Sequence, residues 1–252
     1  MKNVCTIILI LLFVFLQTAF AQANNPIESL NFRIRYGFVN AGSVSLTTQQ
    51  TTHAGKTVYH TRAVAQTTGV VDRMFRFREV YDSFYSRETR LPYLSVTNLQ
   101  HGRWRYHNEN TYNQDAFTVH SSRGDSMIFL TTPVFDLISA ISHFRTLDWS
   151  SFAIGEVIEL EVLHQDSHNT MHVIYRGTEE LSIGSGVFRT HRFVPAIVHD
   201  NIVQGNDNLV IWFSADRNRI PVSIRVNLRV GSFRLELENY ERLRFPMRAR
   251  VR

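Results

Sequence analysis

Cysteine is almost absent from this chain of 252 residues, whose single cysteine is Cys5. Because Cys5 lies inside an N-terminal apolar run, the rest of the chain has no thiol to form a disulfide, bind a metal ion or attack a substrate. The phosphate-binding loops GxGxxG and the Walker pattern are also missing, as is the G-x-S-x-G turn of α/β-hydrolases. These absences exclude the commonest nucleotide-binding and serine-nucleophile motifs.

Lysine is scarce too, since Lys2 and Lys56 are the only ones and arginine carries the other positive charges. Lys and Arg number 27 against 22 Asp and Glu, a formal net charge of +5. Arginine binds phosphate and carboxylate in a bidentate manner that lysine lacks. Net charge alone is weak evidence for a partner, and solvated strand faces explain most of this excess. Anionic envelope polymers or lipid headgroups are the more specific alternative, and no nucleic-acid partner is expected.

The first 21 residues have the three parts of a secretory signal peptide. Lys2 gives the positive start, residues 4–16 form an apolar run, and Ala19-Phe20-Ala21 is a small-x-small cleavage signal. The run is shorter than the roughly 20 residues of a transmembrane helix, which favours cleavage over an uncleaved anchor. We therefore expect an exported protein, periplasmic or envelope-associated, whose mature chain begins at Gln22.

Most of the remaining chain alternates apolar and polar residues, the pattern of half-buried β-strands. One such run has Phe32, Ile34, Tyr36 and Phe38 on one face, and another has Val222, Ile224, Val226, Leu228 and Val230. Each such strand is expected to turn one apolar face toward the core. Roughly a dozen strands of this kind predict a mostly β protein, with an antiparallel sheet wrapped as a spiral β-roll or open barrel.

One segment has helical spacing instead. Its apolar residues are Val134, Leu137, Ile138, Ile141 and Phe144, which predicts one central helix over about residues 133–145. Thr132 is the expected N-cap and Pro133 the first helical residue.

No linker-like composition or fixed-period repeat divides the chain, so one β-rich domain is predicted over residues 22–241. Residues 242–252 follow as a basic C-terminal tail that contains Arg242, Arg244, Arg248, Arg250 and Arg252. Such a tail is a candidate for peripheral contact with an anionic membrane surface, although basic tails are often only disordered ends.

Few residues are candidates for a catalytic or metal-binding role. Asp136, His143 and Arg145 lie on or beside the predicted helix, where a carboxylate beside a histidine can raise its basicity. No nucleophile or third group completes a catalytic set, so anchoring of the helix to the sheet is favoured. His164, His168 and His172 are spaced like zinc ligands on a helix, but the surrounding pattern is a hairpin, and no metal or other cofactor is expected.

A polar turn near the C-terminus supplies the other candidates. Asp216 and Arg219 lie between two apolar runs, where aspartate commonly bonds backbone N–H groups and closes the turn. Trp212, just before the turn, is expected to pack in the core or line a ligand pocket. These residues, with Asp136, His143 and Arg145, form the candidate set for ligand binding or for structure, and none is assigned a catalytic role.

The segments around these residues resemble a known family. IWFSADRNRIPVSIRV, followed by GSFRLELENY, is similar to the closing signature of the bacterial family called domain of unknown function 3108, and the opening FRIRYGFVNAGSVSL and the central FDLISAISHFR are similar to its other segments. The likeness spans about Phe32 to Tyr240. The positions that match the family pattern are Gly37, Ala41, Gly42, Asp136, Ser139, Arg145, Trp212, Ser214, Asp216, Arg219, Pro221, Val222, Gly231 and Tyr240. The resemblance implies an exported envelope protein with a spiral, roll-like sheet, and it implies no reaction and no catalytic residue.

Two classes of function follow. The first is a non-enzymatic binding or scaffold β-roll for a lipid, a glycan or an envelope protein. The alternative is a hydrolase or lyase that acts on an envelope polymer, which requires Asp, His and Arg side chains to meet in one cleft. The missing enzyme motifs favour the first class.

Overall fold

The computed structural model describes residues 26–199, 202–205 and 208–252. The predicted signal peptide, residues 1–21, lies outside the described residues. Within them the strands are β1 Pro26–Tyr36, β2 Val39–His53, β3 Lys56–Thr67, β4 Phe77–Ser86, β5 Pro92–His101, β6 Trp104–Asn113, β7 Thr118–Ser121, β8 Ser126–Phe129, β9 Val157–His164, β10 Ser167–Ile183, β11 Gly186–His199, β12 Ile202–Gly205, β13 Leu209–Ser214, β14 Pro221–Asn227 and β15 Ser232–Glu241. The helices are α2 Gly69–Met74, α3 Leu137–Phe144 and a short 3-10 turn, η2 Trp149–Ser151.

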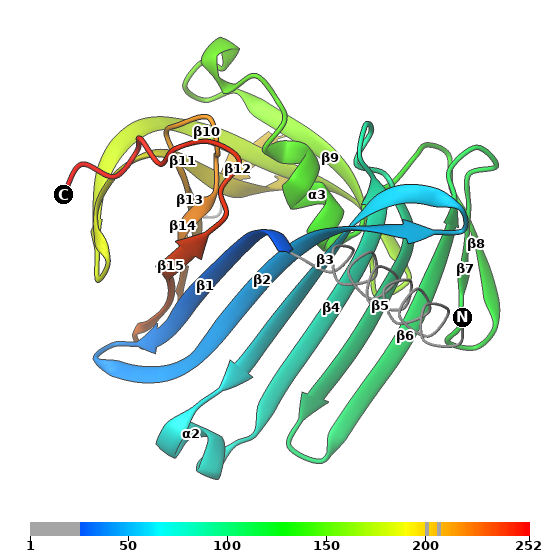
Figure 1. The fold of residues 1–252 in the computed structure, drawn as a ribbon, viewed down its shortest axis with the longest axis horizontal. Helices are drawn as coiled ribbons and strands as arrows, with labels where there is room; N and C mark the ends of the chain where they lie inside the picture. The colour runs from blue at the N-terminus through cyan, green and yellow to red at the C-terminus, as the bar shows by residue number, and fades with distance from the viewer. Residues whose placement is uncertain (1–25, 200–201, 206–207) are drawn as a thin grey trace, which may run out of the picture.

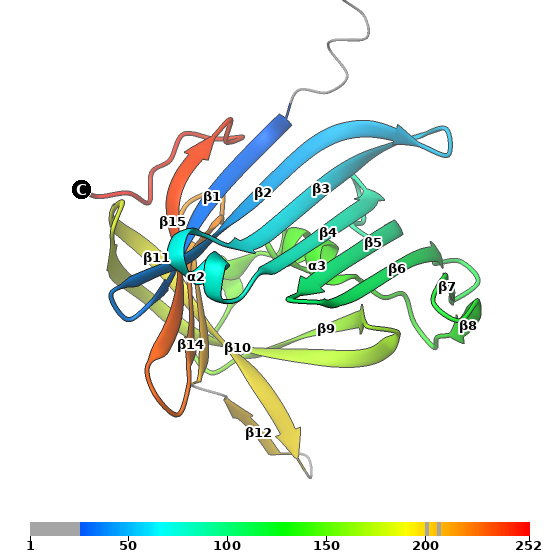
Figure 2. The same cartoon turned by 90° about the horizontal axis from the view of Figure 1, so that it is seen from below.

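All fifteen strands belong to one sheet, in the order β8-β7-β6-β5-β4-β3-β2-β1-β15-β14-β13-β11-β10-β9, with β12 paired to β11. Neighbouring strands are antiparallel, and β1 to β8 follow one another as a meander. The sheet curls round on itself, and α3 lies within the curl (Figures 1 and 2). The predicted antiparallel roll or open barrel is therefore confirmed.

The two edges of the sheet are joined by loops and side chains rather than by a continuous ladder of backbone hydrogen bonds. Phe135, just before α3, forms a parallel bridge with Val162 of the edge strand β9. At the β9–β10 turn, the Asp166 carboxylate accepts hydrogen bonds from Asn108 of β6 at 2.9 Å and Ser121 of β7 at 3.0 Å. These contacts draw the roll together at a seam without closing it as a continuous barrel.

The two largest apolar clusters among the described residues lie in the curl. In the cluster under α3, aromatic rings of Phe144, Trp149, Phe193 and Phe213 lie 4.9 to 5.8 Å apart, mostly tilted or edge to face. The second cluster joins β1, β11, β14 and β15 through Leu30, Phe32, Phe188, Ile220, Val222 and Leu237, all of them buried. The core thus ties the first strands to the last ones, which fixes the curl.

The central helix is shorter than the predicted 133–145. The structure begins α3 at Leu137, and its N-cap is Asp136 instead of Thr132. The Asp136 carboxylate accepts from the N–H of Ile138 and Ser139, and Ser139 Oγ accepts from the Asp136 N–H, a reciprocal capping box. Residues 133–135 lie outside the helix, and Phe135 pairs with β9 there. A second helix, α2, was not predicted, because its six residues are too few to show helical periodicity in the sequence. No helix in the described part of the chain is long and apolar enough to cross a membrane.

The alternating apolar faces are buried only over part of their length. Along β1 and the turn after it, Phe32 is buried, whereas Phe38 is 98% exposed. Along β14 and its turn, Val222 is fully buried, whereas Val230 is 76% exposed. These strands extend past the core, so the same sequence pattern continues where no second layer covers it.

The predicted basic tail is not a free end. Arg248 and Ala249 donate their backbone N–H groups to the Asp216 carboxylate at 2.9 and 3.2 Å. Backbone bonds with Val187 and Arg189 of β11 hold the chain as far as Arg252, and Ala249 is fully buried. Residues 242–252 therefore pack on the domain, while their arginine side chains are exposed.

Candidate functional site

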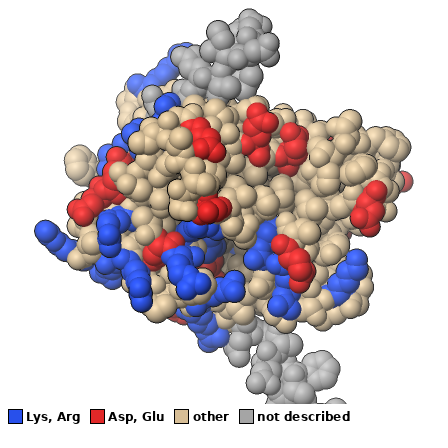
Figure 3. Space-filling view, turned by 90° about the horizontal axis from the view of Figure 1, so that it is seen from above, with Lys and Arg blue, Asp and Glu red and all other residues tan. Residues whose placement is uncertain are grey.

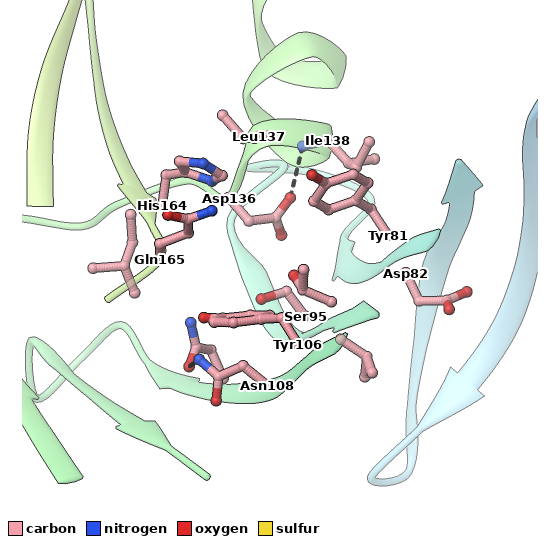
Figure 4. Close-up of a pocket in the computed structure, with 14 residues that line it drawn as sticks. Tyr81, Asp82, Ser95, Tyr106, Asn108, Asp136, Leu137, Ile138, His164 and Gln165 are labelled. Atoms are coloured by element: carbon pink, nitrogen blue, oxygen red, sulfur yellow. Dashed lines mark hydrogen bonds between the residues drawn. The ribbon is translucent and has the colours of Figure 1, made fainter. Parts of the chain in front are cut away.

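Among the described residues, two of the pockets in the roll are lined by candidate residues of the α3 region. The first lies at the seam and encloses about 430 Å³ between atoms, part of it open to solvent. The side chains of Asp136, Tyr81 and Ser95 project into the same space, whereas the Asp82 carboxylate points away from it (Figure 4). Asn108, Asn110 and Gln165 complete much of a polar lining.

Asp136 is the charged centre of this seam pocket, and its carboxylate is already occupied. One oxygen accepts from the N–H of Ile138 and Ser139, and the other accepts from Ser83 Oγ at 2.5 Å. Burial raises the pKa of the Asp136 carboxyl, and the hydrogen bonds from Ser83, Ser139 and Ile138 oppose that rise. With its lone pairs used to anchor α3 to β4, Asp136 is placed as an anchor of the helix and not as a free acid or base.

The second pocket, which we call the mouth pocket, lies where β1 begins and β4 ends. It encloses about 690 Å³ between atoms, part of it solvent. Figure 3 views this end of the molecule, where most of the Lys and Arg side chains in view lie in the lower half. The residues that matter for its chemistry are Glu28, Tyr59, Tyr85, Arg90, Arg145, Arg217, Arg244 and Phe245.

Arg145 forms the floor of the mouth pocket as the C-cap residue of α3. Its guanidinium makes a bidentate pair with Glu28 of β1, with N···O distances of 2.8 and 2.6 Å, and it also donates to the Asn218 carbonyl. Burial disfavours the charged form of Arg145, but the Glu28 carboxylate offsets this and holds the Arg145 pKa above its ordinary value. Arg145 thus joins the helix, β1 and the β13–β14 turn.

Three further arginines surround the mouth pocket without a carboxylate partner among the described residues: Arg90, Arg217 and Arg244. Each guanidinium lies over an aromatic ring instead. Arg90 is 4.8 Å from the Tyr59 ring centroid, and Arg217 and Arg244 are 4.1 and 5.3 Å from that of Phe245. In addition, Arg90 Nε is buried and has no hydrogen-bond partner among these residues. Positive charge at this pocket therefore exceeds the negative charge of Glu28.

The candidate residues Asp216 and Arg219 hold the β13–β14 turn against the rest of the fold. Asp216 accepts from Ser214 Oγ, from the Asn218 N–H and from the backbone of Arg248 and Ala249. Arg219, in a left-handed conformation at φ 48°, donates to the carbonyls of Arg145 and Leu147 just after α3. The two side chains form no hydrogen bond or ion pair with each other, and each holds a different part of the chain.

His143 and Trp212 lie apart from one another. The His143 ring stacks on Phe135 at 4.5 Å between centroids, and burial together with the charge of Arg90 lowers its pKa. Trp212 is buried on β13, where its Nε1 donates to Glu179 at 2.5 Å and Arg225 lies 5.1 Å over its ring. Trp212 does not line the mouth pocket.

The structure therefore brings Arg145, Asp216 and Arg219 to one junction, with Asp136 at the other end of α3 and Trp212 elsewhere. This arrangement lacks the convergent acid, base and nucleophile that a hydrolytic site needs. The described residues also hold no group of three or more His, Cys, Asp or Glu side chains arranged for a metal ion.

Sequence reasoning missed the mouth pocket: Glu28 and Arg90 were not candidates, and Arg217 and Arg244 were assigned to a turn and a basic tail instead of a common site. These residues come from β1, the β4–β5 turn, the β13–β14 turn and the C-terminal segment. No local spacing connects them, so only the curl of the sheet brings them together. The one available signal was the preference for arginine over lysine in the whole chain.

Comparisons with known proteins support the fold. The model of the family described as "Protein of unknown function (DUF3108)" matches residues 31–238. No curated protein matches the chain. Among solved structures, a beta-barrel-like protein of domain of unknown function DUF1849 from Brucella abortus is similar, with a TM-score of 0.59 and 9% identity. The match covers 85% of this chain and 96% of that one, and at this identity it speaks for the fold alone.

Proposed function

Since the chain belongs to the DUF3108 family of proteins of unknown function, we propose its function from its own geometry. We propose that it is an exported, non-enzymatic β-roll of the cell envelope, which binds an anionic lipid headgroup or anionic glycan in the mouth pocket. The observation that carries this proposal is the set of arginines Arg90, Arg217 and Arg244, which face one pocket without a carboxylate partner among the described residues.

Charge and shape both favour an anionic ligand. Guanidinium groups held near one another repel, and an anion between them relieves that repulsion and accepts several hydrogen bonds. An oxygen of the ligand also supplies the partner that Arg90 Nε lacks, and a buried unpaired donor is costly. The ligand group is therefore a phosphate or a carboxylate.

Aromatic and hydroxyl groups beside the arginines point to the rest of the ligand. Tyr59 and Phe245 offer ring faces, while Thr48, Tyr85 and Ser142 offer hydroxyl groups at the same pocket. Ring faces suit the apolar side of a sugar or the glycerol backbone of a lipid. Both a phospholipid headgroup and an acidic sugar meet these conditions, and they share the anion on which the proposal rests.

The proposed location in the cell envelope rests on the predicted signal peptide of residues 1–21. Export places the pocket among phospholipids and acidic polymers, which fits its charge. N-terminal sequencing of the exported protein that reads from Met1 instead of Gln22 would contradict this part of the proposal.

Binding of small anions tests the pocket directly. In isothermal titration at low salt, we expect glycerol phosphate and glucuronate to bind, and we expect the double variant Arg90→Gln/Arg217→Gln to weaken that binding about tenfold or more. The loss follows from the removal of two charge-assisted contacts, each worth roughly 1 kcal/mol or more. The glycerol phosphate arm reports a lipid headgroup, and the glucuronate arm reports an acidic glycan.

Arg248→Gln/Arg250→Gln is the matched control, because it removes the same charge from exposed side chains that do not line the mouth pocket. The control protein should bind both anions like the unaltered protein. Equal weakening in the control and the pocket variant would mean that overall charge, not the pocket, attracts the anion, and the proposal would be wrong.

A further inference from the structure

Exposed apolar side chains gather at the end of the sheet opposite to the mouth pocket. We call this surface the distal rim and define it by residues 35–39, 69–76, 102–105 and 226–234. These are α2 with the two residues after it, and the β1–β2, β5–β6 and β14–β15 turns with the strand residues beside them. Figure 2 looks onto this end, where α2 lies between the β1–β2 and β5–β6 turns.

The four segments form one continuous surface. The Tyr36 hydroxyl donates to the Val230 carbonyl at 2.9 Å, and the rings of Tyr36 and Phe233 are 5.0 Å apart, which joins the β1–β2 and β14–β15 turns. The Thr68 N–H donates to the Ala41 carbonyl, which brings the start of α2 to β2. The Gly102 N–H donates to the Arg76 carbonyl at 2.7 Å, which joins α2 to the β5–β6 turn.

The rim exposes several large apolar side chains close together, which is uncommon on the surface of a soluble monomer. Met74 is 83% exposed, and Phe38 and Val230 are exposed to a similar extent. At least half of the surface of Val70, Phe75 and Trp104 is exposed as well. Contiguous apolar surface of this kind marks a site that another phase or molecule covers.

The same four segments are positively charged. Asp72 is their only acidic residue, and it pairs with Arg76 at 3.5 Å. Their exposed arginines are Arg73, Arg76, Arg103, Arg105, Arg229 and Arg234. Long arginine side chains can lie along an apolar surface while their charged ends reach phosphate groups. Apolar tips surrounded by arginine match the two layers of an anionic bilayer surface, acyl chains below and phosphates above.

We propose that the distal rim docks the protein on an anionic lipid surface. Phe38, Met74, Val230 and Trp104 enter the headgroup region, and the arginines around them bind lipid phosphates. Docking in this way turns the mouth pocket away from the membrane, because the pocket lies at the other end of the strands. The proposal is independent of what the mouth pocket binds.

Vesicle binding tests the proposal. The purified protein should sediment with vesicles of phosphatidylcholine and phosphatidylglycerol, bind weakly to phosphatidylcholine alone, and dissociate as salt is raised. Phe38→Ser/Met74→Ser should weaken binding about tenfold or more, because two apolar side chains that enter the headgroup region are lost. Arg103→Gln/Arg229→Gln should weaken it as well, by roughly fivefold for each arginine.

The fluorescence of Trp104 provides a second measurement of docking on the vesicles. Trp104 is the exposed tryptophan of the chain, since Trp149 and Trp212 are buried. Its emission should therefore shift to the blue when vesicles are added, and Trp104→Phe should remove that shift. An unshifted Trp104 on bound vesicles would place the contact elsewhere and overturn the proposal.

Phe129→Ser/Ile154→Ser is the control, because these residues are 80% and 76% exposed but lie outside the rim. This variant should bind vesicles like the unaltered protein. No vesicle binding at all, or equal binding by the rim variant and the control, would overturn the proposal, and the second result would point to the C-terminal arginines. A dimer that Phe38→Ser/Met74→Ser dissociates, with no vesicle binding, would show that a second copy covers the rim and would also overturn it.

Discussion

Val222→Asp is expected to lower the free energy of unfolding by about 4–5 kcal/mol. Val222 is fully buried and packs with Leu30, Phe32 and Leu237, so it joins strands from the two ends of the chain. A carboxylate placed there must either take up a proton or open the core to water, and both are costly. Urea unfolding monitored by circular dichroism measures the change.

Val230→Asp is the control for this substitution because Val230 has the same place in the alternating pattern but is exposed at the β14–β15 turn. Its effect should stay within about 0.5 kcal/mol, the usual range for surface positions. If the two variants lost stability equally, the description of a strand that leaves the core along its length would be wrong.

The second large effect is expected at the floor of the mouth pocket. Arg145→Ala should cost about 3 kcal/mol, because it leaves the partly buried Glu28 carboxylate without its bidentate partner and the Asn218 carbonyl without a donor. A double-mutant cycle with Glu28→Gln and Arg145→Gln should give a coupling energy of about 1–3 kcal/mol in urea unfolding.

An exposed ion pair serves as the comparison. Arg33 and Glu238 pair on neighbouring strands, with side chains 46% and 47% exposed. The same cycle at Arg33 and Glu238 should give no more than about 0.5 kcal/mol, since solvent screens the pair. A coupling energy at Arg145 as small as that at Arg33 would contradict its role as the link between α3, β1 and the β13–β14 turn.

The sequence was sufficient to predict the fold because alternation is a local property of each strand. Phe32, Val222 and Leu237 are buried as their pattern requires. Phe38 and Val230 follow the same pattern and are exposed, because burial depends on whether another layer covers the strand. The alternation within one strand does not show where another layer of the structure covers that strand.

The helix illustrates a second limit. Spacing of apolar residues located α3 correctly, but its start was predicted at residue 133 because Thr132 and Pro133 are common at helix N-termini. In the structure Asp136 and Ser139 form the capping box, and Phe135 is drawn into a bridge with Val162. A contact with a strand distant in the sequence therefore decided where the helix begins.

The site was the least predictable part. Arg145 was a candidate from its place beside the helix, but its partner Glu28 is 117 residues away. Arg90 and Arg244 are separated by most of the chain and meet only because the sheet curls. Asp136 and His143 drew attention as chemical groups, whereas the geometry uses one as a helix cap and stacks the other on Phe135.

The mouth pocket and the distal rim lie at opposite ends of the same strands, and their charges have different surroundings. In the pocket, arginine lies over tyrosine and phenylalanine rings within a hollow. At the rim, arginine surrounds exposed apolar tips on a projecting surface. A hollow suits one bound anion, and a projecting surface suits a membrane. The two proposals can therefore be tested with variants that do not overlap.

The most direct test of the central claim is to identify what the protein carries when it is purified from its native envelope. Mass spectrometry of the bound molecules should find a phosphate- or carboxylate-bearing lipid or glycan, present in the unaltered protein and in Arg248→Gln/Arg250→Gln but depleted in Arg90→Gln/Arg217→Gln. A folded pocket variant that retains the same molecule in the same amount, or an unaltered protein that carries only uncharged molecules, would contradict the account.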